Sequence, residues 1–134
     1  MNAKELQIGD LVDYRGKVIE VTSLYAKNGS NEVGFGNKED IWVNGCVLNP
    51  IPLTSEILEK NGFVKEIVTN DDTNDDYTAY HWNPTPQYPS DGLWFYPTFS
   101  GYAFDYIMSK IKIKYIHELQ HLLRLCGIDK EITL

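Results

Sequence analysis

The sequence is short of cysteine, of long apolar runs and of positive charge. Its two cysteines, Cys46 and Cys126, are far apart and outside any C-x-x-C spacing, so neither a disulfide framework nor a thiolate zinc site is indicated. We expect both to be buried as small apolar residues. No apolar run approaches the roughly 18 residues of a membrane span, and the start MNAKELQIGD lacks the apolar core of a signal peptide. We therefore expect a cytoplasmic protein that does not contact a membrane.

Acidic residues outnumber basic ones, 19 against 12, and give a formal net charge of −7 over 134 residues. Because this charge repels phosphate backbones, nucleic acid is disfavoured as a partner. The chain also has no G-x-S-x-G turn, P-loop or dinucleotide-binding glycine pattern. A conventional hydrolase or nucleotide enzyme is therefore not expected.

The first part of the chain, residues 1–52, contains short β-branched segments separated by turn residues. DLVDY, KVIEVTSL, EVGFG, IWV and CVL are the expected strands, and the turns between them are rich in Asn and Gly. Five such strands in about 45 residues predict a small, strongly bent, barrel-like lobe. The prolines of Asn49-Pro50-Ile51-Pro52 extend the chain and indicate a joint to a second lobe.

Residues 53–134 predict an α+β lobe; the alternative is that both lobes form one compact domain. A short helix begins at the N-cap Thr54 and ends at Gly62. The segments FVKEIVT, YTAYHW, LWFYPTF, YAFDYI and IKI then predict an antiparallel meander, rich in aromatic residues. The amphipathic stretch from Lys114 to Cys126, stopped by Gly127, predicts a C-terminal helix that packs on this sheet.

That last helix contains the pattern H-E-x-x-H at His117, Glu118 and His121. Spacing of four residues on a helix lets two histidines bind zinc while the glutamate acts as general base, so a minimal zinc-dependent peptidase is one hypothesis. After His121 the only candidates for a third ligand are Cys126, Asp129 and Glu131, and His81 lies in a distant strand. On a helical wheel both histidines point away from the leucine stripe. We therefore interpret them as surface residues and predict no catalytic residue, cofactor or metal.

Three other groups of residues have simpler interpretations. The acidic segment with Asp71, Asp72, Asp75 and Asp76 lacks calcium-loop spacing and predicts a solvated hairpin tip. Alternating lysines at 110, 112 and 114 are typical of an exposed strand face. Aromatic residues beside basic ones can stack single-stranded nucleic acid, although the alternation here favours a core. A further hypothesis is nucleic-acid binding through the barrel of the first lobe, with Lys17, Lys27 and Lys38 in contact with phosphates.

Three segments carry a resemblance to other proteins: ELQIGDLVDYRGKVIEVTSL at 5–24, PIPLTSEILEKNGF at 50–63 and IKYIHELQHLLRLCG at 113–127. They resemble small uncharacterised proteins of Bacteroides-type gut bacteria and their prophages. The last helix of that group is close to Y-[LVI]-H-[QE]-L-Q-N-L, so His117, Leu119 and Gln120 fit it, whereas His121 stands where asparagine is usual. The resemblance implies no activity. We therefore expect a non-enzymatic accessory module of mobile-element or prophage origin that binds another protein; homo-oligomerisation is left open.

Overall fold

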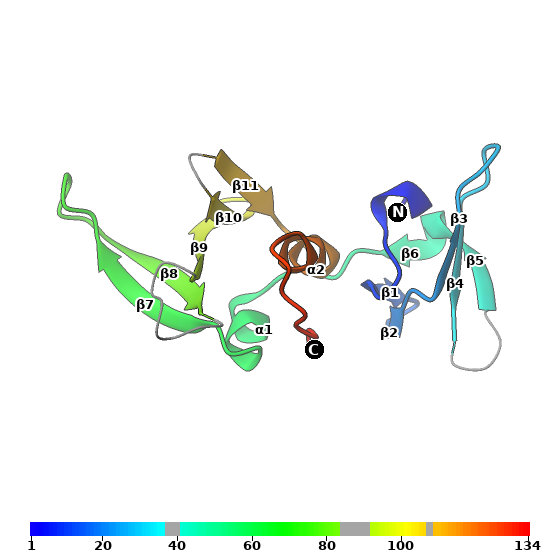
Figure 1. Ribbon diagram of the computed structural model, residues 1–134, viewed down its shortest axis with the longest axis horizontal. Helices are drawn as coiled ribbons and strands as arrows, with labels where there is room; N and C mark the ends of the chain where they lie inside the picture. Colours follow the sequence, from blue (N-terminus) through cyan, green and yellow to red (C-terminus); the bar gives the residue numbers. More distant parts are fainter. Residues whose placement is uncertain (37–40, 84–91, 107–108) are drawn as a thin grey trace. The chain divides into compact units, whose positions relative to one another are not determined.

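The computed structural model describes residues 1–36, 41–83, 92–106 and 109–134 (Figure 1). The fold is α+β, as predicted, with more residues in strands than in helices. The chain divides into two compact units: Met1–Pro52 with Tyr115–Glu131, and Leu53–Lys114 with Ile132–Leu134. Within the described ranges, none of the helices has both the length and the apolar character that a membrane crossing requires.

The first unit contains two three-stranded antiparallel sheets. One has the order β2-β1-β6 and the other the order β3-β4-β5. The strands are β1 (Leu11–Tyr14), β2 (Lys17–Glu20), β3 (Ser23–Tyr25), β4 (Glu32–Phe35), β5 (Ile41–Asn44) and β6 (Leu48–Asn49). The 3-10 helices η1 (Ala3–Glu5) and η2 (Gly45–Val47) complete the unit's short elements.

The predicted barrel is not found, because the described strands of this unit form two separate open sheets. The chain changes sheet between two consecutive residues. Val21 exchanges backbone hydrogen bonds with Gly9 and Asp10 beside the first sheet, whereas the N–H of Thr22 donates to the carbonyl of Gly34 in the second. The core of the unit is formed by buried apolar side chains from both sheets and from the N-terminal segment: Ala3, Leu6, Val12, Val21, Val33 and Leu48.

The second unit begins with α1 (Ser55–Lys60) and continues as a five-stranded sheet. The predicted N-cap is confirmed, since the hydroxyl of Thr54 accepts a hydrogen bond from Ile57 N at 3.4 Å. Gly62, with φ of +80°, lets the chain reverse after the helix, and the N–H of Phe63 then donates to Leu58 O at 3.0 Å. This pattern is a Schellman C-cap, so local sequence accounts for both ends of the helix.

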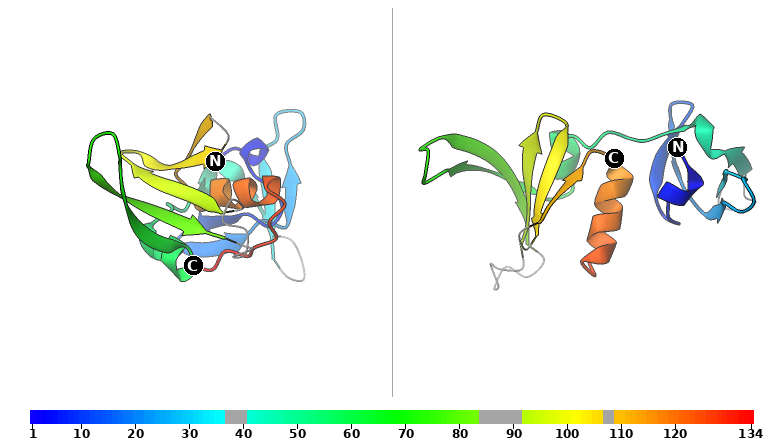
Figure 2. Two further views of the ribbon diagram at one scale, coloured as in Figure 1. Left: turned by 60° about the vertical axis from the view of Figure 1, so that its left-hand side comes forward. Right: turned by 90° about the horizontal axis from the view of Figure 1, so that it is seen from above.

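The sheet is the antiparallel meander that the sequence predicts, with the order β11-β10-β9-β8-β7 (Figure 2). Its strands are β7 (Val64–Thr69), β8 (Asp76–Trp82), β9 (Leu93–Thr98), β10 (Gly101–Tyr106) and β11 (Ser109–Ile113). Tyr80, Phe95 and Phe104 stand opposite one another across three strands and are buried, so their side of the sheet is the core side. Phe63 adds to this core with an edge-on ring contact to Phe95 at 5.3 Å.

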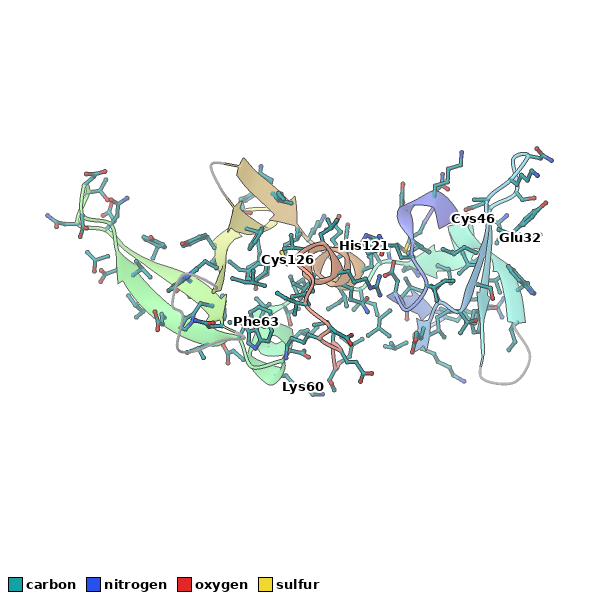
Figure 3. The ribbon with its side chains drawn as sticks, in the orientation of Figure 1. Glu32, Cys46, Lys60, Phe63, His121 and Cys126 are labelled. Atoms are coloured by element: carbon teal, nitrogen blue, oxygen red, sulfur yellow. The ribbon has the colours of Figure 1, made fainter. Side chains whose placement is uncertain are left out.

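The C-terminal helix α2 (Ile116–Leu125) ends in a second Schellman cap at Gly127, whose φ is +70°. The sequence-based division places this helix with residues 53–134, whereas the structure groups Tyr115–Glu131 with the first unit, where α2 contacts β1. The polar contacts between α2 and the segment before β1 are described below. The prediction that both cysteines are buried is wrong, since Cys46 and Cys126 are free and exposed (Figure 3).

Candidate functional site

The H-E-x-x-H segment lies on α2 with most of its side chains buried. The apolar positions Ile116, Leu119 and Leu123 are fully buried, as the periodicity predicts. His117 and Gln120 are also buried, with exposed fractions of 6% and 8%. The interpretation of the two histidines as surface residues is therefore wrong for His117, and the side chain of His121 is only 21% exposed. The physical reason is that the segment from Gln7 to Leu11 binds Gln120, His121 and Arg124 on the polar side of this helix. The ring of His117 packs against the rings of Tyr115 and His121.

The side chain of Gln120 binds the backbone of the two residues that flank Asp10 in this segment. Its Nε2 donates to the carbonyl of Gly9 at 2.9 Å, and its Oε1 accepts from the N–H of Leu11, also at 2.9 Å. The side-chain amide thus satisfies a backbone donor and a backbone acceptor that β-sheet pairing leaves free. Only Gln or Asn supplies this donor and acceptor pair.

Asp10, the residue between these two backbone contacts, has an exposed fraction of 0%. Its Oδ2 lies 2.7 Å from His121 Nε2 and accepts from Gln7 N at 2.7 Å. Its Oδ1 accepts from Arg124 at 2.8 Å, and the same guanidinium nitrogen donates to Gln7 Oε1 at 3.0 Å. A buried carboxylate is stable only when it is paired and hydrogen-bonded in this way. We call Gln7, Asp10, Gln120, His121 and Arg124 the Asp10 network.

His117 lies beside this network without joining it. Its ring stacks on Tyr115 and meets the ring of His121 edge-on, with centroids 5.8 Å apart in both cases. Its Nδ1 is buried and has no hydrogen-bond partner. Burial lowers the pKa of His117, and the charge of His121 acts in the same direction, against the opposing effect of Glu118, Asp10 and Glu5. Burial therefore favours the neutral form of this imidazole.

Glu118, His121 and the third histidine of the chain, His81, each have a partner in the structure. The carboxylate of Glu118 accepts from Tyr115 N at 3.1 Å, a contact typical of the N-terminus of a helix. His121 is bound to Asp10, and His81, in the second unit, is bound to Glu66 at 2.9 Å. In the part of the chain that the structure describes, no three His, Cys, Asp or Glu side chains are placed to hold a metal ion. Thus Glu118 and His121 both have structural partners.

The remaining candidate residues lie on exposed parts of the chain. Asp71, Asp72, Asp75 and Asp76 lie in and beside the exposed turn between β7 and β8, where the sequence predicts a hairpin tip. Lys17, Lys27, Lys112 and Lys114 are also exposed, whereas Lys38 lies outside the described residues. Asp129 and Glu131 line a shallow hollow of about 180 Å³ together with Arg124.

A group of aromatic side chains occupies the side of the second unit's sheet opposite Phe95. Strand alternation and register place five residues of β8 and β9 on this side, and we call them the aromatic face: Tyr77, Ala79, His81, Trp94 and Tyr96. The rings form two cross-strand pairs, Tyr77 with Tyr96 at 5.7 Å and His81 stacked on Trp94 at 4.7 Å. Ala79 lies between these pairs and is fully buried.

Sequence reasoning finds the aromatic strands but misses this second surface. In the run Trp94-Phe95-Tyr96 every residue is aromatic, so alternation alone does not distinguish the buried side from the outer side. The signal that could have found the outer side is the small residue at Ala79, between Tyr77 and His81 on the same side of β8.

Comparison of the chain with protein-family models, with curated proteins and with solved structures gave no match. What can be inferred about function therefore rests on the residues and their arrangement.

Proposed function

We propose that the chain is a small cytoplasmic accessory protein of mobile-element or prophage origin that binds another protein and carries out no catalysis itself. The observation that carries this proposal is the aromatic face of the second unit. Tyr and Trp are enriched in the energetically dominant positions of protein interfaces, because they bury a large apolar area and still offer a polar group.

The geometry of the aromatic face supports a role in binding. Its rings are held in cross-strand pairs, so their side chains lose little further conformational entropy when a partner covers them. Tyr77 is exposed, while His81, Trp94 and Tyr96 are half-buried, which leaves polar edges and ring surface for contact. Glu66, bound to His81 at the border of this surface, offers a carboxylate to a donor on the partner.

The surroundings of the H-E-x-x-H segment support the absence of catalysis in this proposal. Two of the three groups of the H-E-x-x-H segment that would perform hydrolysis are bound within the fold, Glu118 to Tyr115 N and His121 to Asp10, and the third, His117, is buried. For this reason we do not advance the peptidase hypothesis. The nucleic-acid hypothesis has no specific support either, since it depends on a barrel and on Lys38, which lies outside the described residues.

Site-specific photo-crosslinking in the host cell tests the proposal. A photo-reactive phenylalanine analogue at position 77 is expected to cross-link to one protein species, and Tyr96→Ser in the same chain should reduce that product at least several-fold. The matched control carries the analogue at position 25, because Tyr25 is an exposed tyrosine of the first unit. Equal products from both positions, or none from position 77, would contradict a binding role for the aromatic face.

A further inference from the structure

Strand β7 is an edge of the five-stranded sheet, because its only partner among the described strands is β8. The pairing with β8 is continuous from Val64, opposite His81, to Thr69, opposite Asp76, without a bulge. The strand also contains no proline. Natural sheets usually protect such edges with bulges, prolines, very short strands or charged side chains. Of these devices β7 has only two adjacent charged residues, Lys65 and Glu66.

The hydrogen-bonding groups at the free edge of β7 can be assigned from its pairing. In an antiparallel ladder, bonded and non-bonded residue pairs alternate along the strands. Asn70 N donates to Asp75 O at 2.9 Å, so the pair at this position is bonded. Counting back from it, Val64, Glu66 and Val68 bond to β8, whereas the backbone N–H and C=O groups of Lys65, Ile67 and Thr69 point to the free edge.

Apolar side chains on both sides of the sheet accompany these free backbone groups. Ile67 is 73% exposed and lies on the core side, and Val64 is 53% exposed on the side of the aromatic face. β11, at the opposite edge, has two lysines at alternate positions and one exposed apolar residue, Ile111, whereas β7 has a single lysine, Lys65. Of the two edges of the described sheet, β7 is therefore the one suited to accept another strand.

We propose that β7 pairs antiparallel with β7 of a second copy of this chain, with the two Ile67 residues opposite each other at the centre. In this register Lys65 of each copy faces Thr69 of the other, so every outward N–H and C=O of these three residues has a partner. Glu66 faces Val68, and no like charges stand opposite each other. A register centred on Lys65 would place two lysines opposite each other, which is destabilising.

The symmetry of this pairing has a consequence for binding. The two-fold axis of an antiparallel pair centred on one residue is perpendicular to the sheet. The aromatic faces of both copies then lie on the same side of one continuous sheet. The dimer is independent of the proposed function, since it can form whether or not the aromatic face binds a partner.

Analytical ultracentrifugation over a concentration series tests the dimer. The wild type should show a concentration-dependent shift from 15.4 kDa to twice that mass, and Ile67→Lys should remain at 15.4 kDa. Phe99→Lys is the matched control, because Phe99 is fully exposed at the turn between β9 and β10. This variant should dimerise as the wild type does. A wild type that stays monomeric, or Ile67→Lys that dimerises equally well, would overturn the proposal.

Cysteine cross-linking tests the register without weakening the interface. In a background with Cys46→Ser and Cys126→Ser, oxidised Ile67→Cys should form a covalent dimer, because the two Cα atoms would be roughly 5.5 Å apart. Val64→Cys is the control, since residue 64 of one copy would face residue 70 of the other. Cross-linking at 64 but not at 67 would overturn the proposed register.

Discussion

At the scale of single residues, Asp10 is the side chain that His121 and Arg124 of α2 share as a partner. It is fully buried and binds His121, Arg124 and the backbone of Gln7. Without the Asp10 carboxylate, the side chains of His121 and Arg124 lose the partner that they share. Removing this buried acceptor is costly because the half-buried ring of His121 and the backbone N–H of Gln7 lose a partner, although the Arg124 side chain, which is 37% exposed, can bind water instead.

We therefore predict that Asp10→Ala lowers the free energy of unfolding by about 3 kcal/mol. Asp72→Ala, in the exposed turn between β7 and β8, is the control and should change it by less than about 0.5 kcal/mol. Urea denaturation followed by circular dichroism measures both values. Equal, small effects of the two substitutions would show that the Asp10 network contributes little to stability.

His117 gives the fold a predicted dependence on pH. Burial lowers its pKa in the folded state from the ordinary value of 6.5, so the unfolded chain binds the proton more readily. The contribution of His117 to stability is thus complete above about pH 6.5 and decreases as the pH falls below this value.

Replacing His117 with leucine should flatten this dependence, because leucine has no proton to bind. We expect the stability difference between wild type and His117→Leu to shift in favour of the variant as the pH is lowered from about 7.5 to 5.5. Urea denaturation at several pH values measures it. Because Asp10, Glu5, Glu118 and His121 remain in both proteins, parallel curves would exclude a lowered pKa at His117.

At the scale of elements, the features set by neighbouring residues could be predicted from the sequence. Thr54 caps α1, and Gly62 and Gly127 end the two helices, because capping depends on a few adjacent positions. The antiparallel meander also follows from local pattern, since its strands are consecutive. The start of α1, the ends of both helices, the strand order in the second unit and the α+β class could therefore be predicted from the sequence.

Features that depend on distant residues could not be predicted. Gln120 is bound by the backbone of Gly9 and Leu11, and Leu11 is 109 positions away from it in the sequence. A helical wheel counts Gln120 as solvent-facing because it describes only the helix itself. The same limit applies to the open sheets of the first unit, where the change of partner at Val21 and Thr22 decides against a barrel.

At the scale of the whole molecule, α2 lies far from β1 in sequence but belongs to the same unit. Two backbone hydrogen bonds, one in each unit, lie next to the boundaries of the units in the chain. In the first unit Ile116 N donates to Ile51 O at 2.9 Å, and in the second Leu53 N donates to Lys114 O at 2.9 Å. The polar residues Gln120 and His121 of the H-E-x-x-H segment thus bind the first unit at Gly9, Asp10 and Leu11.

Zinc titration tests whether His121 is a partner of Asp10 or a metal ligand. The whole protein is purified without a histidine tag and treated with a chelator beforehand. Isothermal titration calorimetry should detect no stoichiometric binding, and added zinc should leave the unfolding midpoint unchanged, because Asp10 already occupies His121 Nε2. His121→Asn and, as the control from the second unit, His81→Asn should give the same result. One zinc ion per chain, lost in His121→Asn and kept in His81→Asn, would contradict the pairing of His121 with Asp10 and restore the peptidase hypothesis.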